Sequence, residues 1–147
     1  MNQCYRKPDA RAIINGGKKY PQIHGEAAFF QTNCAVKIIV KIKGLPENET
    51  GFYGFHIHEG ERCSGESFSD TGGHYNPNDE KHPCHAGDLP PLLSCSGNSY
   101  MEVKTDRFRV KDVIGKTVII HAGTDDLRTQ PSGNSGDKIA CGEICRE

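Results

Sequence analysis

The segment from Glu59 to Asn98 limits what this chain can fold into, because it has no regular pattern of its own. Gly, Ser, Pro, Asn and Asp dominate it, and no run within it repeats with the period of a helix or a strand. A structureless loop of this length is uncommon in a compact domain and is usually functional or disordered. Something must fasten it if it is ordered, and metal bonds together with a disulfide would do so.

Histidines are concentrated in and around this segment. Five of the seven lie in the 36 residues from Gly54 to Leu89, a sixth, His121, ends the apolar run Thr117–Ile120, and only His24 stands apart. Neutral imidazole is the commonest protein ligand for metals such as zinc and copper. A set of histidines that ends in Asp88 therefore predicts a metal site.

Two of these histidines form a local pair. His56 and His58 alternate with Phe55 and Ile57, so on a strand both imidazoles would project from one face while the apolar pair faces the core. A His-x-His pair taken alone is more often two satisfied surface histidines. The further histidines make a metal-binding arm the better interpretation.

A second cluster follows at His82, His85 and Asp88. Two imidazoles and a carboxylate suit zinc, which accepts nitrogen and oxygen ligands in a tetrahedron, and His74 can fill the remaining corner. The alternative is a polar loop whose histidines are neighbours by chance. That alternative leaves the order of the long loop unexplained.

The rest of the chain has the pattern of short strands. The clearest is Cys34–Lys43, where every second residue is apolar and lysines occupy the other face, as in a half-buried antiparallel strand. Further strands are expected at Arg11–Ile14, Ile23–Gln31, Phe52–His58, Tyr100–Thr105, Thr117–His121 and Lys138–Ile144, with Phe108–Ile114 more ambiguous and a second long loop at Ala122–Asp137. This pattern predicts one all-β domain, a sandwich or barrel, over residues 1–147.

The charge balance excludes several classes of protein. Eighteen basic and nineteen acidic residues give a net charge of −1 without a long run of either sign, which argues against a nucleic-acid or membrane-surface partner. No apolar run reaches the ~20 residues of a membrane span, and no secretory signal is visible after Met1, which predicts a cytoplasmic protein. Seven cysteines favour the alternative, an oxidising extracytoplasmic setting.

Several motifs in order point to one family. They are Gly54–Glu59 (GFHIHE), Gly73–Pro77 (GHYNP), His85–Leu89 (HAGDL), His121 with Asp125–Leu127, and Gly133–Gly136 (GNSG) leading to Ala140–Gly142 (ACG). In these segments, and over most of the chain from about Ala12 to Ile144, the sequence resembles the copper/zinc superoxide dismutases. The resemblance implies an eight-stranded antiparallel Greek-key β-barrel or sandwich with two long functional loops.

The resemblance also implies the ligands. Copper would be held by His56, His58, His74 and His121. Zinc would be held by His74, His82, His85 and Asp88, so that His74 bridges both metals as an imidazolate. Asp125 matches the carboxylate that links a copper histidine to a zinc histidine, and Cys63 and Cys141 match the family's disulfide.

The implied activity is the dismutation of superoxide to dioxygen and hydrogen peroxide by one-electron cycling of copper. In the family picture, His74 releases copper on reduction, takes up a proton and later returns it. Zinc would be mainly structural. Family members occur as monomers and as homodimers, and the sequence does not decide between these two states.

The chain departs from the family at one functional position. The arginine usually found three residues before the last disulfide cysteine is replaced by Lys138, which keeps the charge but not the planar fork of donors. Lys138 is expected to attract superoxide, with Arg128 in the same loop as a second cation. Both functional loops are also short, and His82 and His85 lie only three residues apart.

The remaining cysteines have no role in the family. Cys84 and Cys95 flank the predicted zinc loop and could pair, and Cys4 and Cys145 near the two termini could also pair, although the sequence alone selects neither bond. Cys34 would then be the odd thiol.

Two rival functions accompany the enzyme. The first is a copper-binding protein that buffers or delivers the metal and catalyses weakly because of Lys138. The second is a structural domain with zinc alone, against which the intact trio His56, His58 and His121 argues, since zinc would not need it.

Overall fold

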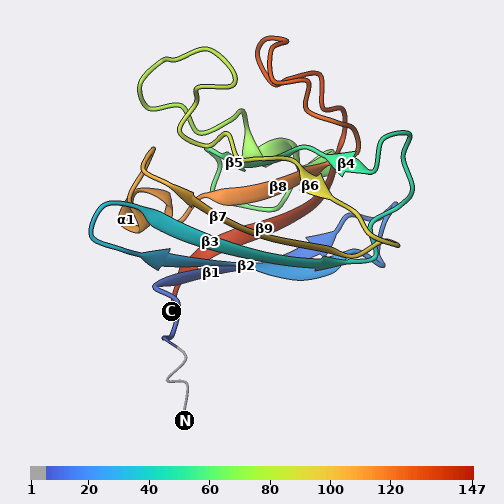
Figure 1. The fold of residues 1–147 in the computed structure, drawn as a ribbon. Helices are drawn as coiled ribbons and strands as arrows, with labels where there is room; N and C mark the ends of the chain where they lie inside the picture. Colours follow the sequence, from blue (N-terminus) through green and yellow to red (C-terminus); the bar gives the residue numbers. More distant parts are fainter. Residues whose placement is uncertain (1–5) are drawn as a thin grey trace.

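The computed structural model describes residues 6–147, and most of its strands form one curled antiparallel sheet (Figure 1). The strand order is β5-β8-β9-β1-β2-β3-β7. These strands are β1 (Ala10–Gly16), β2 (His24–Gln31), β3 (Val36–Lys43), β5 (Phe55–His58), β7 (Ser99–Thr105), β8 (Thr117–His121) and β9 (Lys138–Arg146). Two short strands, β4 (Phe52–Tyr53) and β6 (Leu92–Leu93), pair separately.

The connections make a Greek key. Strands β1, β2 and β3 follow one another as antiparallel neighbours, the chain then crosses to β5 at the opposite edge of the sheet, and β7 returns beside β3. On β3 the four alternating apolar residues are buried, as their period predicts: Val36, Ile38, Val40 and Ile42. The prediction of an all-β antiparallel fold is confirmed.

Several details differ from the sequence-based expectation. The single strand expected at Phe52–His58 is two strands, because Gly54 donates its N–H to the carbonyl of Gly123 and accepts from the N–H of His121 instead of continuing one ladder. A four-residue helix, α1 (Val110–Val113), lies in the ambiguous stretch. Strand β6 and a 3₁₀ segment, η1 (Glu66–Thr71), were not expected. Residues 6–147 thus contain nine strands rather than eight.

The two long loops rise on the same side of the sheet, above β5 and β8 (Figure 1). We call residues 59–91 the first loop and residues 122–137 the second loop. The first loop is fastened to the free edge of β5 by backbone hydrogen bonds, from the Ile57 N–H to Gly87 at 2.9 Å and from the Tyr75 N–H to Ile57 at 2.8 Å. Isolated bridges from His56 to Asp88 and from His58 to His74 continue this pairing, so backbone pairing orders the loop along with side-chain bonds.

The cysteines confirm one expected pairing and contradict another. Cys63 on the first loop is bonded to Cys141 on β9, with a Cα–Cα distance of 5.7 Å. The expected bond between Cys84 and Cys95 is wrong, because both are free and exposed. Cys4 lies outside the described residues, so its pairing with Cys145 stays a prediction. Cys34 is free as well, so it is not the single odd thiol.

Neither helical segment within residues 6–147 has the length and apolar character that a membrane-spanning helix requires.

Candidate metal centre

Strands β5 and β8 bring three histidines together. His56 and His58 lie on β5, and His121 ends β8, which pairs with β5 in antiparallel register. All three side chains are buried. His58 Nε2 and His121 Nε2 face one another at 3.3 Å. With His74 from the first loop, these residues offer four ligand atoms that all lie within 4.8 Å of one another.

The hydrogen bonds of the rings determine which nitrogens are free. His58 Nδ1 donates to the carbonyl of Gly72 at 2.8 Å, and His121 Nδ1 donates to the carbonyl of Gly136 at 3.0 Å. In the neutral rings both facing Nε2 atoms then carry lone pairs and cannot hydrogen-bond to each other. A cation between them satisfies both, so this pair fits a metal.

A second group lies beside the first and shares His74 with it. His74, His82, His85 and Asp88 again offer ligand atoms within 4.8 Å of one another, and all four residues are buried. Asp88 reaches His74 Nδ1 through Oδ1 at 2.7 Å and lies 3.1 Å from His82 Nδ1 and 3.2 Å from His85 Nδ1 through Oδ2. Three imidazole nitrogens and one carboxylate suit tetrahedral zinc.

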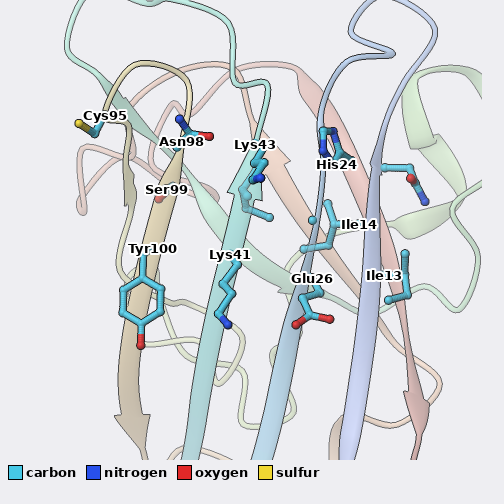
Figure 2. Close-up of a pocket in the computed structure, with 13 residues that line it drawn as sticks. Ile13, Ile14, His24, Glu26, Lys41, Lys43, Cys95, Asn98, Ser99 and Tyr100 are labelled. Atoms are coloured by element: carbon cyan, nitrogen blue, oxygen red, sulfur yellow. The ribbon is translucent and has the colours of Figure 1, made fainter.

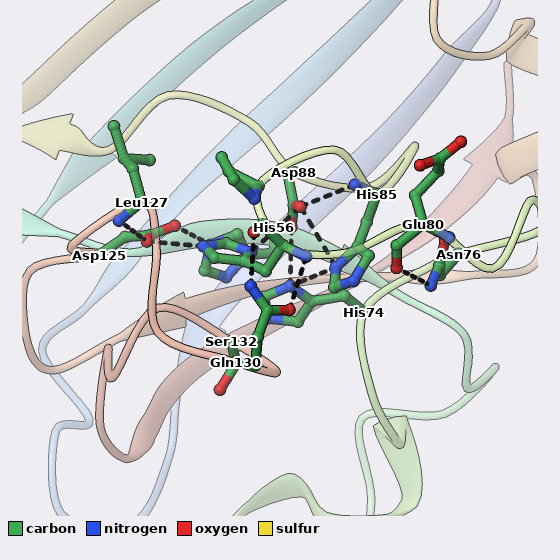
Figure 3. A network of polar contacts seen from close by, with 12 residues as sticks. His56, His74, Asn76, Glu80, His85, Asp88, Asp125, Leu127, Gln130 and Ser132 are labelled. Carbon is green, nitrogen blue, oxygen red and sulfur yellow. Dashed lines mark hydrogen bonds and ion pairs between the residues drawn. The ribbon is translucent and has the colours of Figure 1, made fainter.

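Asp125 on the second loop connects the two groups. Its Oδ2 accepts from His56 Nε2 at 2.7 Å and its Oδ1 from His82 Nε2 at 2.8 Å (Figure 3). Each ring is thereby fixed with Nδ1 free. The approach is close enough that a Cβ on Gly133 would lie 1.9 Å from Asp125 Oδ1, so only glycine fits there, and its φ of +73° also favours glycine.

Unpartnered buried atoms provide the test of whether metals fit. Besides the facing Nε2 atoms of His58 and His121, the described residues contain three buried side-chain nitrogens without a hydrogen-bond partner, His56 Nδ1, His74 Nε2 and His82 Nδ1. Leaving a buried polar atom unpaired costs about 1–3 kcal/mol. All three belong to the two histidine groups, and metal coordination would satisfy each of them. The two groups therefore fit copper and zinc.

Burial also keeps the rings neutral, as metal ligands must be. Burial lowers the pKa of His58 to about 2 and that of His121 to about 3, with a hydrogen bond to a backbone carbonyl opposing the shift in each ring. For Asp88, burial raises the pKa, but the hydrogen bond from His74 and the neighbouring imidazoles outweigh it and the pKa lies below its usual value. The carboxylate is thus ionised and able to bind a cation.

Lys138 at the start of β9 is held against the first loop. Its Nζ donates to Thr71 Oγ1 and to the Gly72 carbonyl, both at 2.8 Å, and lies 3.4 Å from the Phe68 carbonyl. The Gly72 carbonyl is also the acceptor of His58 Nδ1. The ammonium group of Lys138 and the ring of His58 therefore donate to the same carbonyl oxygen, which places the charge close to the first group of histidines. Arg128 is exposed on the second loop.

Sequence reasoning missed the residues that hold the loops. Arg107 Nη1 donates to three carbonyls of the first loop, those of Pro83 at 2.8 Å, His85 at 3.2 Å and Asp88 at 3.4 Å. Glu143 on β9 accepts the N–H of Cys63 at 3.0 Å. These side chains bind main-chain groups. Because every residue has such groups, the amino-acid type of the bonded residue does not reveal the contact.

His24, the histidine that stood apart in the sequence, is also apart in space. It lies with Glu26, Lys41 and Tyr100 along a groove of about 710 Å³ across β1, β2, β3 and β7 (Figure 2). Its Nδ1 bonds to the carbonyl of Gln22 at 2.9 Å. It belongs to neither metal group.

Comparison with known proteins agrees with this geometry. Residues 23–144 match the family model described as copper/zinc superoxide dismutase. "Superoxide dismutase [Cu-Zn] 2" of Aquifex aeolicus is 35% identical over 138 residues, covering 84% of this chain and 80% of the relative. The Legionella pneumophila "Superoxide dismutase [Cu-Zn]" is 35% identical over 140 residues, covering 90% and 83%. "Extracellular superoxide dismutase [Cu-Zn]" of Caenorhabditis elegans is 33% identical over 154 residues, covering 92% and 68%. This chain belongs to the copper/zinc superoxide dismutase family.

Proposed function

We propose that this protein dismutates superoxide, converting two superoxide ions and two protons into one dioxygen and one hydrogen peroxide. The observation that carries the proposal is the position of His74, which belongs to both groups of ligands. Its Nδ1 faces Asp88, while its buried Nε2 has no hydrogen-bond partner. A histidine placed in this way can bind two metals at once.

The four-imidazole group would hold copper and the group with Asp88 would hold zinc. Four nitrogen ligands suit copper(II), which prefers tetragonal geometry, whereas three imidazoles and a carboxylate suit tetrahedral zinc. The copper ligands would be His56, His58, His74 and His121. The zinc ligands would be His74, His82, His85 and Asp88.

Bound copper would supply the one-electron chemistry, accepting an electron from one superoxide and giving it to a second. Within the chain, His74 Nε2 is the atom at which a proton would be held and then transferred to the peroxide product. Asp125 fixes the ring orientations of His56 and His82, and outer partners of this kind also raise ligand basicity.

Lys138 would guide the anionic substrate. Its ammonium is partly buried, which lowers its pKa, and three oxygen acceptors hold it beside the backbone that orients His58. A fixed positive charge near the reacting metal raises the local concentration of a small anion, an effect for which superoxide dismutases are a standard example. Lysine in place of arginine offers one charged group without a planar fork.

The copper-buffering alternative is not favoured. A buffer needs ligands, but it does not need a histidine placed between two ion sites or a carboxylate that joins one ring of each site. The chain has both, in His74 and Asp125. The zinc-only alternative leaves the facing Nε2 atoms of His58 and His121 without a purpose.

Metal analysis and a superoxide assay test the proposal together. We expect one copper and one zinc per chain, and fast superoxide decay only when copper is present. His121→Ala should lose copper and activity but keep zinc, whereas His82→Ala should lose zinc first. A wild-type protein that binds both metals and does not accelerate superoxide decay would refute the enzymatic function.

We also propose that the protein works in a reducing compartment such as the cytoplasm. Three exposed cysteines are free, namely Cys34, Cys84 and Cys95, and exposed thiols persist where the surroundings are reducing. Maleimide labelling of protein isolated without reductant should modify these thiols. Extensive intermolecular disulfides would instead support an extracytoplasmic location. A homodimer stays a prediction that sedimentation velocity can test.

A further inference from the structure

The side chain of Gln130, on the second loop, contacts both backbone polar groups of His82. Its Oε1 accepts the His82 N–H at 2.9 Å, and its Nε2 donates to the His82 carbonyl at 2.7 Å (Figure 3). Two facing residues of an antiparallel sheet exchange the same pair of bonds. The amide of Gln130 therefore holds the backbone of His82 as a neighbouring strand would.

The ring of His82 is held from the same loop. Asp125 Oδ1 accepts from His82 Nε2 at 2.8 Å, and the side chain of His82 is fully buried. With the backbone fixed by Gln130 and one ring nitrogen fixed by Asp125, the remaining nitrogen, Nδ1, can point in only one direction. It lies 3.1 Å from Asp88 Oδ2.

We propose that Gln130 is a positioning residue for the zinc ion, acting through His82. The inference rests on the assignment of zinc to His82 and Asp88 under the proposed function. The first loop is short, and Gln130 on the second loop supplies the backbone partner that fixes this ligand. Gln130 bonds the backbone of His82, which belongs only to the group with Asp88, so its effect is on the affinity and geometry of the zinc site rather than on the copper site.

The chain offers a matched control in Gln31. Its Nε2 donates to the carbonyls of Thr32 at 2.8 Å and Ala35 at 3.0 Å, and its Oε1 accepts the N–H of Val110 at 2.9 Å. Gln130 makes the same number of bonds, since its Nε2 also donates to the carbonyl of Arg128 at 3.0 Å. Substituting methionine at either position removes an equivalent clamp, but only one of the two clamps holds a proposed zinc ligand.

The test compares Gln130→Met, Gln130→Glu and Gln31→Met in the full chain. Zinc affinity is measured by competition with a chromophoric chelator on copper-free, zinc-loaded protein, and ligand geometry by the visible spectrum of cobalt(II) bound in place of zinc. Gln130→Met should weaken zinc by about 10- to 100-fold and alter the cobalt spectrum. Gln130→Glu keeps the acceptor but loses the donor and should fall between Gln130→Met and wild type.

Gln31→Met should lower the Tm by a similar amount to Gln130→Met but leave zinc affinity and the cobalt spectrum unchanged. The inference is overturned if Gln130→Met binds zinc as wild type does, or if Gln31→Met weakens zinc equally. Failure of the wild-type protein to bind zinc, or an unchanged zinc affinity in His82→Ala, would instead overturn the zinc assignment of the proposed function.

Discussion

Reversing the charge of Lys138 should slow the capture of superoxide more than the same change elsewhere on the surface. Lys138 Nζ and His58 Nδ1 both donate to the carbonyl of Gly72, each at 2.8 Å. The ammonium is therefore fixed beside the proposed copper site. Lys138→Glu replaces an attractive charge by a repulsive one at this place.

The size of the effect follows from Coulomb's law. An anion about 6 Å from a unit charge gains about 0.7 kcal/mol at the dielectric constant of water and about 3 kcal/mol at an effective value of 20. Reversing the charge doubles the difference, so the smallest expected change is about 1.4 kcal/mol, which is about tenfold in rate. Lys138→Met removes the charge without reversing it and should produce about half the change in free energy.

The assay is superoxide decay followed by pulse radiolysis at low and high ionic strength, with copper content matched between variants. The difference between Lys138→Glu and wild type should shrink at high salt, because the screening length falls to about 3 Å at 1 M. Lys41 is an exposed residue of β3, which is far from β5 in the sheet order. Lys41→Glu makes the same change in net charge there and serves as the control. Equal kcat/KM for Lys138→Glu and wild type at low salt would refute the role of Lys138.

Three further predictions concern stability and metal retention. Arg107→Met removes the donor to three carbonyls of the first loop and should weaken zinc by about tenfold in chelator competition; an unchanged affinity would show that the loop needs no such support. Cys63→Ser opens a cross-link between residues 78 apart and should lower the free energy of unfolding by about 4 kcal/mol, measured with guanidinium, whereas a loss below about 1 kcal/mol would contradict the loop-entropy estimate. Burial lowers the pKa of His58 to about 2 and that of His121 to about 3, against about 6.5 in the unfolded chain. Between these folded and unfolded pKa values, the unfolded state of the metal-free protein binds up to two more protons at these histidines than the folded state does. Its stability should therefore fall by up to about 2.7 kcal/mol per pH unit as the pH drops below about 6, and equal urea midpoints at pH 7.5 and pH 5 would contradict this.

The strands and the grouping of histidines could be predicted because both depend on side chains with a clear pattern. The period of β3 separates buried from exposed residues, and the His-x-His pair on β5 needs only the pleat of a strand to face one way. The break at Gly54 could not be predicted, since it depends on backbone bonds to His121 at the end of β8 and to Gly123 after it.

The supporting residues of the site were missed for a related reason. Arg107 and Gln130 bind backbone carbonyls and N–H groups, which every residue carries, so neither spacing nor composition identifies their partners. The pairing of Cys84 with Cys95 was wrong because two cysteines near one loop in sequence need not meet in space. The family resemblance supplied the disulfide between Cys63 and Cys141, which spacing alone would not have selected.

Because the first loop is docked on β5, retention of the metals should affect the solubility of the protein as well as its catalytic activity. While Gly87 and Tyr75 pair with Ile57, the outermost strand of the sheet has no open hydrogen-bonding row there. If loss of the ions releases the loop from β5, that row becomes a template on which another polypeptide can assemble. Metal-free protein should then self-associate through the exposed edges of β5. The bound ions would prevent this association by keeping the first loop in place, a role separate from their part in catalysis.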